Sequence, residues 1–179
     1  MSENIKIYNG ATNDDNSDMS AVIEVMKEHR ANGNIDKAKK LGKSLSEIDL
    51  NLKDLLAPKF MKSDIIYQVK VMLVFAAELN LQMLISAPML STTAINSMYD
   101  AIQKKSEGFY SNISDGVAFS FYYAGVRNGG DIAEDIGKTF AMLCSAQDNE
   151  SFIEAGAKVY KAALAVITEK INEADFSLI

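Results

Sequence analysis

Residues 69–77 read VKVMLVFAA, and this stretch decides the fold because Lys70 is its only polar residue. A helix that is apolar on almost every side must be buried in the middle of a protein. The apolar positions continue with helical spacing on both sides, and Ser63 is a residue type that begins helices well. We therefore predict one central helix over about residues 63–86.

The segment before this helix, residues 34–57, carries an apolar seam with the three- and four-residue spacing of a heptad repeat. Pro58 then ends the pattern, because proline restricts the residue before it to extended conformations. Two helices over 34–57 and 63–86 with such a short connection predict a long antiparallel helical hairpin. The seam consists of Ala38, Leu41, Leu45, Ile48, Leu52 and Leu55.

The other segments also show helical spacing, and no stretch after residue 16 alternates convincingly with the period of a strand. The sequence therefore predicts an all-α, single-domain multi-helix bundle of about six to seven helices over residues 17–179. Residues 1–16 are expected to form a disordered or loosely packed tail. The remaining helices are expected over about 17–30, 91–105 and 115–128, with two more beginning near Asp131 and Ser151.

The chain of 179 residues is acidic, with a formal net charge of -6 that is concentrated in its second half. Nucleic-acid binding depends on cationic side chains that neutralise phosphates, so we predict no nucleic-acid partner. The uncharged stretch 79–99 holds too many polar side chains to span a membrane, so we predict no membrane partner. The single cysteine, Cys144, and a polar N-terminus without an apolar signal core predict a cytoplasmic protein.

Motifs for metal, phosphate or covalent chemistry are incomplete in this sequence. Residues 137–139, Gly-Lys-Thr, resemble the end of a phosphate-binding loop, but Ile132 replaces the first glycine of that motif. We interpret Gly137 as a site of close helix packing instead. His29 is the chain's one histidine and fits a cation at the end of a helix, so we expect no metal site. We predict no cofactor and no catalytic residues, and we favour a non-enzymatic protein.

Aromatic side chains crowd into residues 109–123 and occupy more than one face of the helix expected at 115–128. Such a helix is either buried between layers of the core or covered by a ligand or a partner. Glu78 interrupts an apolar helix, so its carboxylate is either exposed on a polar strip or paired. The candidate ligand or interface residues are Tyr122, Tyr123, Arg127, Phe121 and Glu78.

We predict a protein-interaction or regulatory helical module, because the chain offers apolar surfaces and no catalytic constellation. Its simplest form is a homo-oligomer that associates through the seam of 34–57 or through the aromatic helix 115–128. The alternative is a small-molecule-binding helical protein with a pocket lined by aromatic residues and methionines. Those methionines are Met72, Met83, Met89 and Met98, with Tyr122, Tyr123 and Arg127 as polar contacts. A third hypothesis is an enzyme, whose chemistry would fall to Asp, Glu, Lys, Tyr or Arg side chains; Glu78 and Arg127 could act as a pair only if the fold brings them together.

Overall fold

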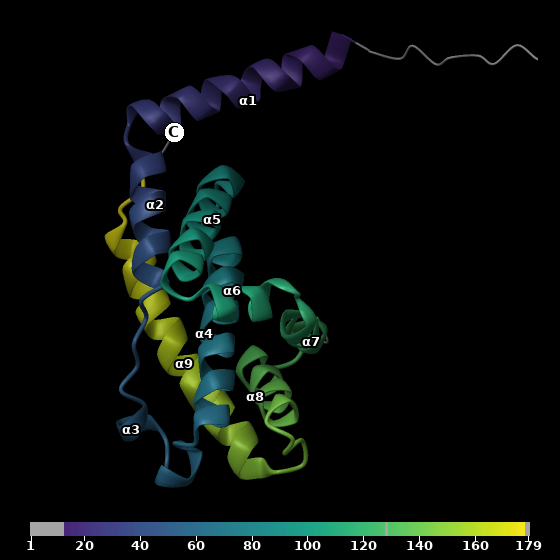
Figure 1. The fold of residues 1–179 in the computed structure, drawn as a ribbon. Coiled ribbons are helices and arrows are strands. Elements are labelled where there is room, and N and C mark those ends of the chain that lie inside the picture. Colours follow the sequence, from purple (N-terminus) through teal and green to yellow (C-terminus); the bar gives the residue numbers. More distant parts are fainter. Residues whose placement is uncertain (1–12, 128, 178–179) are drawn as a thin grey trace, which may run out of the picture.

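The computed structural model describes residues 13–127 and 129–177, and every regular element in these residues is a helix (Figure 1). The predicted all-α multi-helix bundle is confirmed. In chain order the elements are α1 (Asn13–Ala31), α2 (Asn34–Leu45), α3 (Leu52–Leu55), the 3-10 helix η1 (Pro58–Phe60), α4 (Ser63–Leu84), α5 (Pro88–Lys105), α6 (Glu107–Ser114), α7 (Val117–Val126), α8 (Ile132–Leu143) and α9 (Glu150–Glu173).

Helix α4 occupies the centre of the bundle, as the stretch 69–77 predicts (Figure 1). α5, α7, α8 and α9 all pack against it. Val69, Met72, Phe75 and Ala76 have no exposed surface. Burying apolar surface stabilises a fold by about 25 cal/mol per Å². A helix that is apolar on nearly every side therefore gains most when other helices surround it.

Helices α8 and α9 form a tightly packed hairpin in which two glycines replace side chains at the crossing. A Cβ atom on Gly137 would lie 2.3 Å from the backbone oxygen of Ile153. A Cβ atom on Gly156 would lie 2.8 Å from Cδ1 of Phe140 and 3.0 Å from Cα of Gly137. Gly137 thus serves close helix packing, as expected, and residues 137–139 lie inside helix α8.

The helix expected over residues 34–57 ends at Leu45, which corrects the sequence-based prediction. Hydroxyl groups interrupt it there, because Ser44 Oγ donates to Leu41 O and Ser46 Oγ donates to Lys43 O. Such local hydrogen bonds offer the backbone an alternative to further helical turns. Only the short α3 resumes the pattern, and the expected hairpin with 63–86 is replaced by packing of α2 on α5 and α9.

The contact between α2 and α5 is as close as that between α8 and α9. A Cβ atom on Gly42 would lie 2.0 Å from the backbone oxygen of Ala94. The first half of the predicted seam, Ala38, Leu41 and Leu45, is buried within the chain. These residues are therefore not available to a second copy of the chain in this structure.

The aromatic region also contains one more helix than the sequence predicts. Helix α6 precedes α7, and Gly116 separates the two with a φ of 74°. Ser106 begins α6, since its side chain accepts a hydrogen bond from the Phe109 N–H at 3.4 Å. A helix of two turns is too short to show a clear apolar period, which explains why the pattern missed it.

Helix α1 projects away from the bundle and meets it only at its C-terminal end (Figure 1). His29 lies in the last turn of α1, as expected, and is buried there, with its Nδ1 3.1 Å from Asn34 Nδ2. The buried Asn34 side chain also donates to Ser177 O at 2.8 Å and accepts from Ser177 N at 2.9 Å. Residues 13–16 of the expected tail belong to α1, and residues 1–12 lie outside the described residues.

The close contact of α8 and α9 at Gly137 predicts that one added methyl group lowers the stability of the fold. Gly137→Ala should lower the free energy of unfolding by about 2 kcal/mol, because its Cβ has no room beside Ile153 O and the two helices must separate. Urea denaturation measures this change. Gly108→Ala is the matched control, since a Cβ atom there meets nothing within 4 Å in helix α6. The control should be neutral or slightly stabilising. Equal stability of the two variants would contradict the close packing of α8 on α9.

Candidate functional site

The aromatic helix α7 packs its rings around Phe75 of the central helix. The ring centroid of Phe75 lies 5.5 Å from Phe119, 4.8 Å from Tyr122 and 5.0 Å from Tyr123. Tyr122 stacks face to face with Phe75, and the other two rings meet it edge-on. Three of the α7 rings thus belong to the core, whereas the candidate Phe121 is 46% exposed on the outer side of the helix.

A half-buried carboxylate lies at the edge of this aromatic core. Tyr123 Oη donates a hydrogen bond to Oε1 of Glu78 at 2.6 Å, and Tyr99 Oη donates to Oε2. Tyr99 also meets the ring of Tyr110 edge-on, with centroids 6.3 Å apart. We call Glu78, Tyr99 and Tyr123 the Glu78–tyrosine cluster. Its two hydroxyl donors satisfy both carboxylate oxygens, so Glu78 is paired rather than free on a polar strip.

The carboxylate changes the acidity of the two phenols that it binds. Burial, followed by the hydrogen bond and the negative charge of Glu78, raises the pKa of Tyr99 far above its ordinary value. Burial and the same carboxylate raise the pKa of Tyr123, and a hydrogen bond from Gln82 partly opposes the rise. Both phenols therefore stay protonated at neutral pH, and both act as hydrogen-bond donors to Glu78.

Among the five candidate residues, the structure joins the side chains of Glu78 and Tyr123 by a hydrogen bond. Arg127 ends α7 and is exposed, and no ion pair among the described residues involves Arg127 or Glu78. The pairing of Glu78 with Arg127, considered as one catalytic arrangement, is thus not formed. Tyr99 completes the cluster but was missed, because nothing in the sequence relates it to a carboxylate 21 residues earlier.

Tyr122 and Cys144 occupy an apolar part of the core. The Tyr122 hydroxyl is fully buried and has no hydrogen-bond partner among the described residues. Its pKa is raised by burial and, to a lesser extent, by the neighbouring Cys144. Burial, with a further contribution from Asp64, raises the pKa of the half-buried Cys144 thiol to about 11. The thiol is therefore protonated at neutral pH and lacks the thiolate character of a catalytic cysteine.

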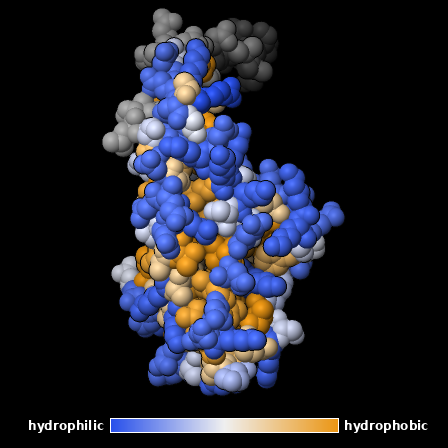
Figure 2. Space-filling view, turned by 90° about the vertical axis from the view of Figure 1, so that its left-hand side faces the viewer, coloured by the Kyte–Doolittle hydropathy of each residue, from blue (hydrophilic) through white to orange (hydrophobic). Residues whose placement is uncertain are grey.

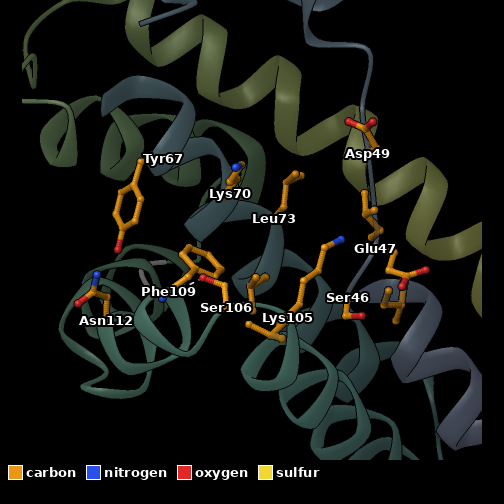
Figure 3. Close-up of a pocket in the computed structure, with 14 residues that line it drawn as sticks. Ser46, Glu47, Asp49, Tyr67, Lys70, Leu73, Lys105, Ser106, Phe109 and Asn112 are labelled. Atoms are coloured by element: carbon orange, nitrogen blue, oxygen red, sulfur yellow. Dashed lines mark hydrogen bonds between the residues drawn. The ribbon is translucent and has the colours of Figure 1, made fainter. Parts of the chain in front are cut away.

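A pocket of about 600 Å³ opens on a different part of the α4 surface (Figure 3). Its walls are the segment 46–49 after α2, one face of α4, the end of α5 and helix α6. We call it the α4–α6 pocket. The apolar lining consists of Leu45, Ile48, Tyr67, Leu73, Val74, Ile102 and Phe109, and the polar lining consists of Ser46, Glu47, Asp49, Lys70, Lys105, Ser106 and Asn112.

The α4–α6 pocket has a different lining from the one that the sequence predicts. No methionine lines it, and neither do Tyr122, Tyr123 and Arg127. Met72 and Met98 have no exposed surface, because they fill the core instead. Two aromatic rings line it, those of Tyr67 and Phe109, whose centroids are 5.8 Å apart.

Apolar side chains also reach the surface elsewhere on the bundle. Figure 2 shows them in a band along the face on which α2, α3 and α9 lie, interrupted by polar side chains.

Within the described part of the chain, no three His, Cys, Asp or Glu side chains gather as a metal site would require. None of the described helices combines the length and the hydropathy needed to cross a bilayer.

Comparisons with protein-family models, with curated proteins and with solved structures return no match to this chain. The function of this protein must therefore be inferred from its own surfaces.

The Glu78–tyrosine cluster predicts the alkaline titration of the protein. Because the folded-state pKa values of Tyr99 and Tyr123 are raised, these phenols stabilise the fold fully below about pH 10 and lose this contribution as the pH rises further. Glu78→Gln removes the negative charge, so both phenols should ionise at lower pH and the free energy of unfolding at pH 7 should fall by about 1 kcal/mol.

The ultraviolet absorbance of ionised tyrosine, measured against pH in the folded protein, reports the pH at which the two phenols ionise. Glu169→Gln is the matched control, because this substitution removes the same charge from an exposed position on α9. An identical tyrosine titration for both variants would show that Glu78 does not hold the two phenols.

Proposed function

We propose that this protein is a protein-interaction module that self-associates, and that α1 is its contact surface. The observation that carries this proposal is the exposure of the apolar side chains of α1. Val22 is 59% exposed, Ile23 45%, Val25 43% and Met26 44%. Helix α1 packs on α2 at its C-terminal end, and the rest of its length projects from the bundle (Figure 1).

The spacing of these side chains is that of an interface helix. Val22, Ile23 and Met26 are one, three and four residues apart, so they lie on one side of α1. An apolar stripe along one side of a helix is the pattern by which amphipathic helices dock into grooves or pair with other helices. Most helices in proteins owe their stability to the packing of such a face, and among the described helices α1 packs mainly on α2.

A second copy of the same chain is the simplest partner, because twofold pairs are the commonest assemblies. The seam of α2, expected as one contact surface, is buried against the chain's own helices. The core side of α7 is buried as well, but Val117 and Phe121 are exposed and Arg127 ends the helix. Helix α1 is therefore the favoured contact, and the outer side of α7 is a second surface for a partner.

The proposed location is the cytoplasm. The one cysteine is free and protonated, and a reducing compartment keeps such a thiol in this state.

Small-molecule binding is a second candidate function, and the α4–α6 pocket is the observation that favours it. Its volume of about 600 Å³ lies within the range of known ligand sites. The mixed lining, apolar with charged groups of both signs, fits an amphipathic ligand rather than a purely apolar one.

Self-association through α1 predicts the outcome of a simple charge substitution. Light scattering of the full chain at micromolar concentration should give about twice the 19.6 kDa of one chain. Ile23→Lys should reduce the mass to that of a monomer, because it places a charge in the apolar stripe. Ala21→Lys is the matched control, since it adds the same charge to the opposite side of α1 and should leave the dimer intact. A wild-type chain that stays monomeric, or two variants with equal masses, would refute the proposal.

A further inference from the structure

We propose that His29 is a pH-sensitive switch that controls the docking of the C-terminal segment, residues 174–177. The neutral imidazole keeps the Asn34 side chain in the orientation that binds Ser177, and a proton on the ring releases the segment. The switch lies at the joint where α1, α2 and this segment meet (Figure 1). It does not depend on the proposed self-association.

The Asn34 amide binds the backbone of Ser177 through both of its polar atoms. Asn34 Nδ2 donates to Ser177 O at 2.8 Å, and Asn34 Oδ1 accepts from Ser177 N at 2.9 Å. A backbone N–H can only donate, and a backbone carbonyl can only accept. The two contacts therefore fix which end of the amide is nitrogen and which end is oxygen.

This orientation of the amide decides the protonation state of His29. Ser177 O takes one hydrogen of Asn34 Nδ2, which leaves the other hydrogen for His29 Nδ1, 3.1 Å away. Nδ1 can accept it only without a hydrogen of its own, so the ring is neutral and its hydrogen lies on Nε2. Asn34 has no exposed surface and His29 is buried, so a lost hydrogen bond at this place is costly.

A proton on His29 is incompatible with this set of hydrogen bonds. The imidazolium carries a hydrogen on both ring nitrogens, so its Nδ1–H would face the N–H of Asn34. If the Asn34 amide turned over, its oxygen would accept from the ring. The same turn would bring the amide oxygen against Ser177 O and the amide nitrogen against Ser177 N. Asn34 can therefore bind the protonated ring or the Ser177 backbone, but not both.

The charged groups around the joint do not compensate for the added proton. No ion pair among the described residues involves His29. The segments that meet there carry six cationic and five acidic side chains, and Lys37 already places its ammonium group on Asp175 O. The charged residues are Glu24, Lys27, Glu28 and Arg30 in the last two turns of α1, Asp36, Lys37, Lys39 and Lys40 in the first two turns of α2, and Lys170, Glu173 and Asp175 from the last turn of α9 onward.

The C-terminal segment has few other contacts that could hold it in place. Besides the bond from Lys37 to Asp175 O, the half-buried Phe176 packs against the core, and Ser177 is exposed. Segments with so few buried contacts open locally at a small cost in free energy. The loss of both bonds to Asn34 is therefore enough to detach the segment.

The direction of the pH dependence follows from the form of the ring that binds. Because the neutral imidazole is required, docking of the segment is complete at higher pH and is lost as the pH falls. Histidine side chains exchange their proton in the range of about pH 5–8, so mild acid operates the switch. His29 lies in the last turn of α1, so its protonation also loosens the joint from which α1 projects.

The test follows His29 and Ser177 in the full chain by nuclear magnetic resonance. His29 is the chain's one histidine, so its ring signal is unambiguous. From about pH 7.5 to about pH 5, the protection factor of the Ser177 amide against hydrogen exchange should fall about tenfold or more, in step with the ring signal. The amide of Phe75 in the central helix should stay protected, because the bundle remains folded.

Two variants assign the change to His29. His29→Asn offers an acceptor oxygen beside Asn34 but takes up no proton in this range, so Ser177 should stay protected at both pH values. Asp175→Asn is the matched control, because it removes the acidic group of the segment itself. Asparagine tolerates the left-handed backbone at this position, where φ is 46°. This variant should lose Ser177 protection with the same pH profile as the original chain.

Each outcome decides the proposal. Loss of Ser177 protection in the original chain and in Asp175→Asn, but not in His29→Asn, supports the switch. An equal loss in His29→Asn, a constant protection down to about pH 5, or a parallel loss at Phe75 would overturn it. If His29→Asn fails to hold Ser177 even at about pH 7.5, the original chain decides: equal midpoints for the ring and the Ser177 amide support the switch, and different midpoints overturn it.

Discussion

The arrangement of this protein depends on the burial of one helix that has almost no polar side. Helix α4 cannot lie on a surface, because Val69, Met72, Phe75 and Ala76 require contacts in several directions. Other helices therefore surround α4, and the close contacts at Gly42, between α2 and α5, and at Gly137, between α8 and α9, hold these surrounding helices together. Glycine at these positions removes the side chain that would otherwise hold the helix axes apart.

Glu78 is the exception within this central helix, and its environment shows how a carboxylate is accommodated there. A partly buried charge is costly unless its oxygens receive hydrogen bonds. Tyr99 from α5 and Tyr123 from α7 donate one each, so the same interaction that satisfies the charge also ties two neighbouring helices to α4. The Glu78–tyrosine cluster therefore connects three helices, besides being a candidate site. The α4–α6 pocket, which lies on the same central helix, is more open to solvent than this cluster.

The sequence predicts the structure best where a segment consists almost entirely of one kind of side chain. The central position of α4 follows from the stretch 69–77, and the role of Gly137 follows from the absence of a complete phosphate motif around it. The end of α2 was not predicted, because the seam continues through Leu52 while Ser44 and Ser46 stop the helix by local hydrogen bonds.

The site was harder to predict for a different reason. The partners of Glu78 and the walls of the α4–α6 pocket come from helices that meet only in three dimensions. The sequence does predict helix α1, but only the structure shows in which direction this helix leaves the bundle. The buried Asn34 holds the Ser177 backbone by two hydrogen bonds and lies beside His29, so the joint at the base of α1 is itself packed and bonded. A helix fixed at its base loses less conformational entropy on docking than a free segment would. The C-terminal segment of the chain thereby helps to fix the direction of the first helix.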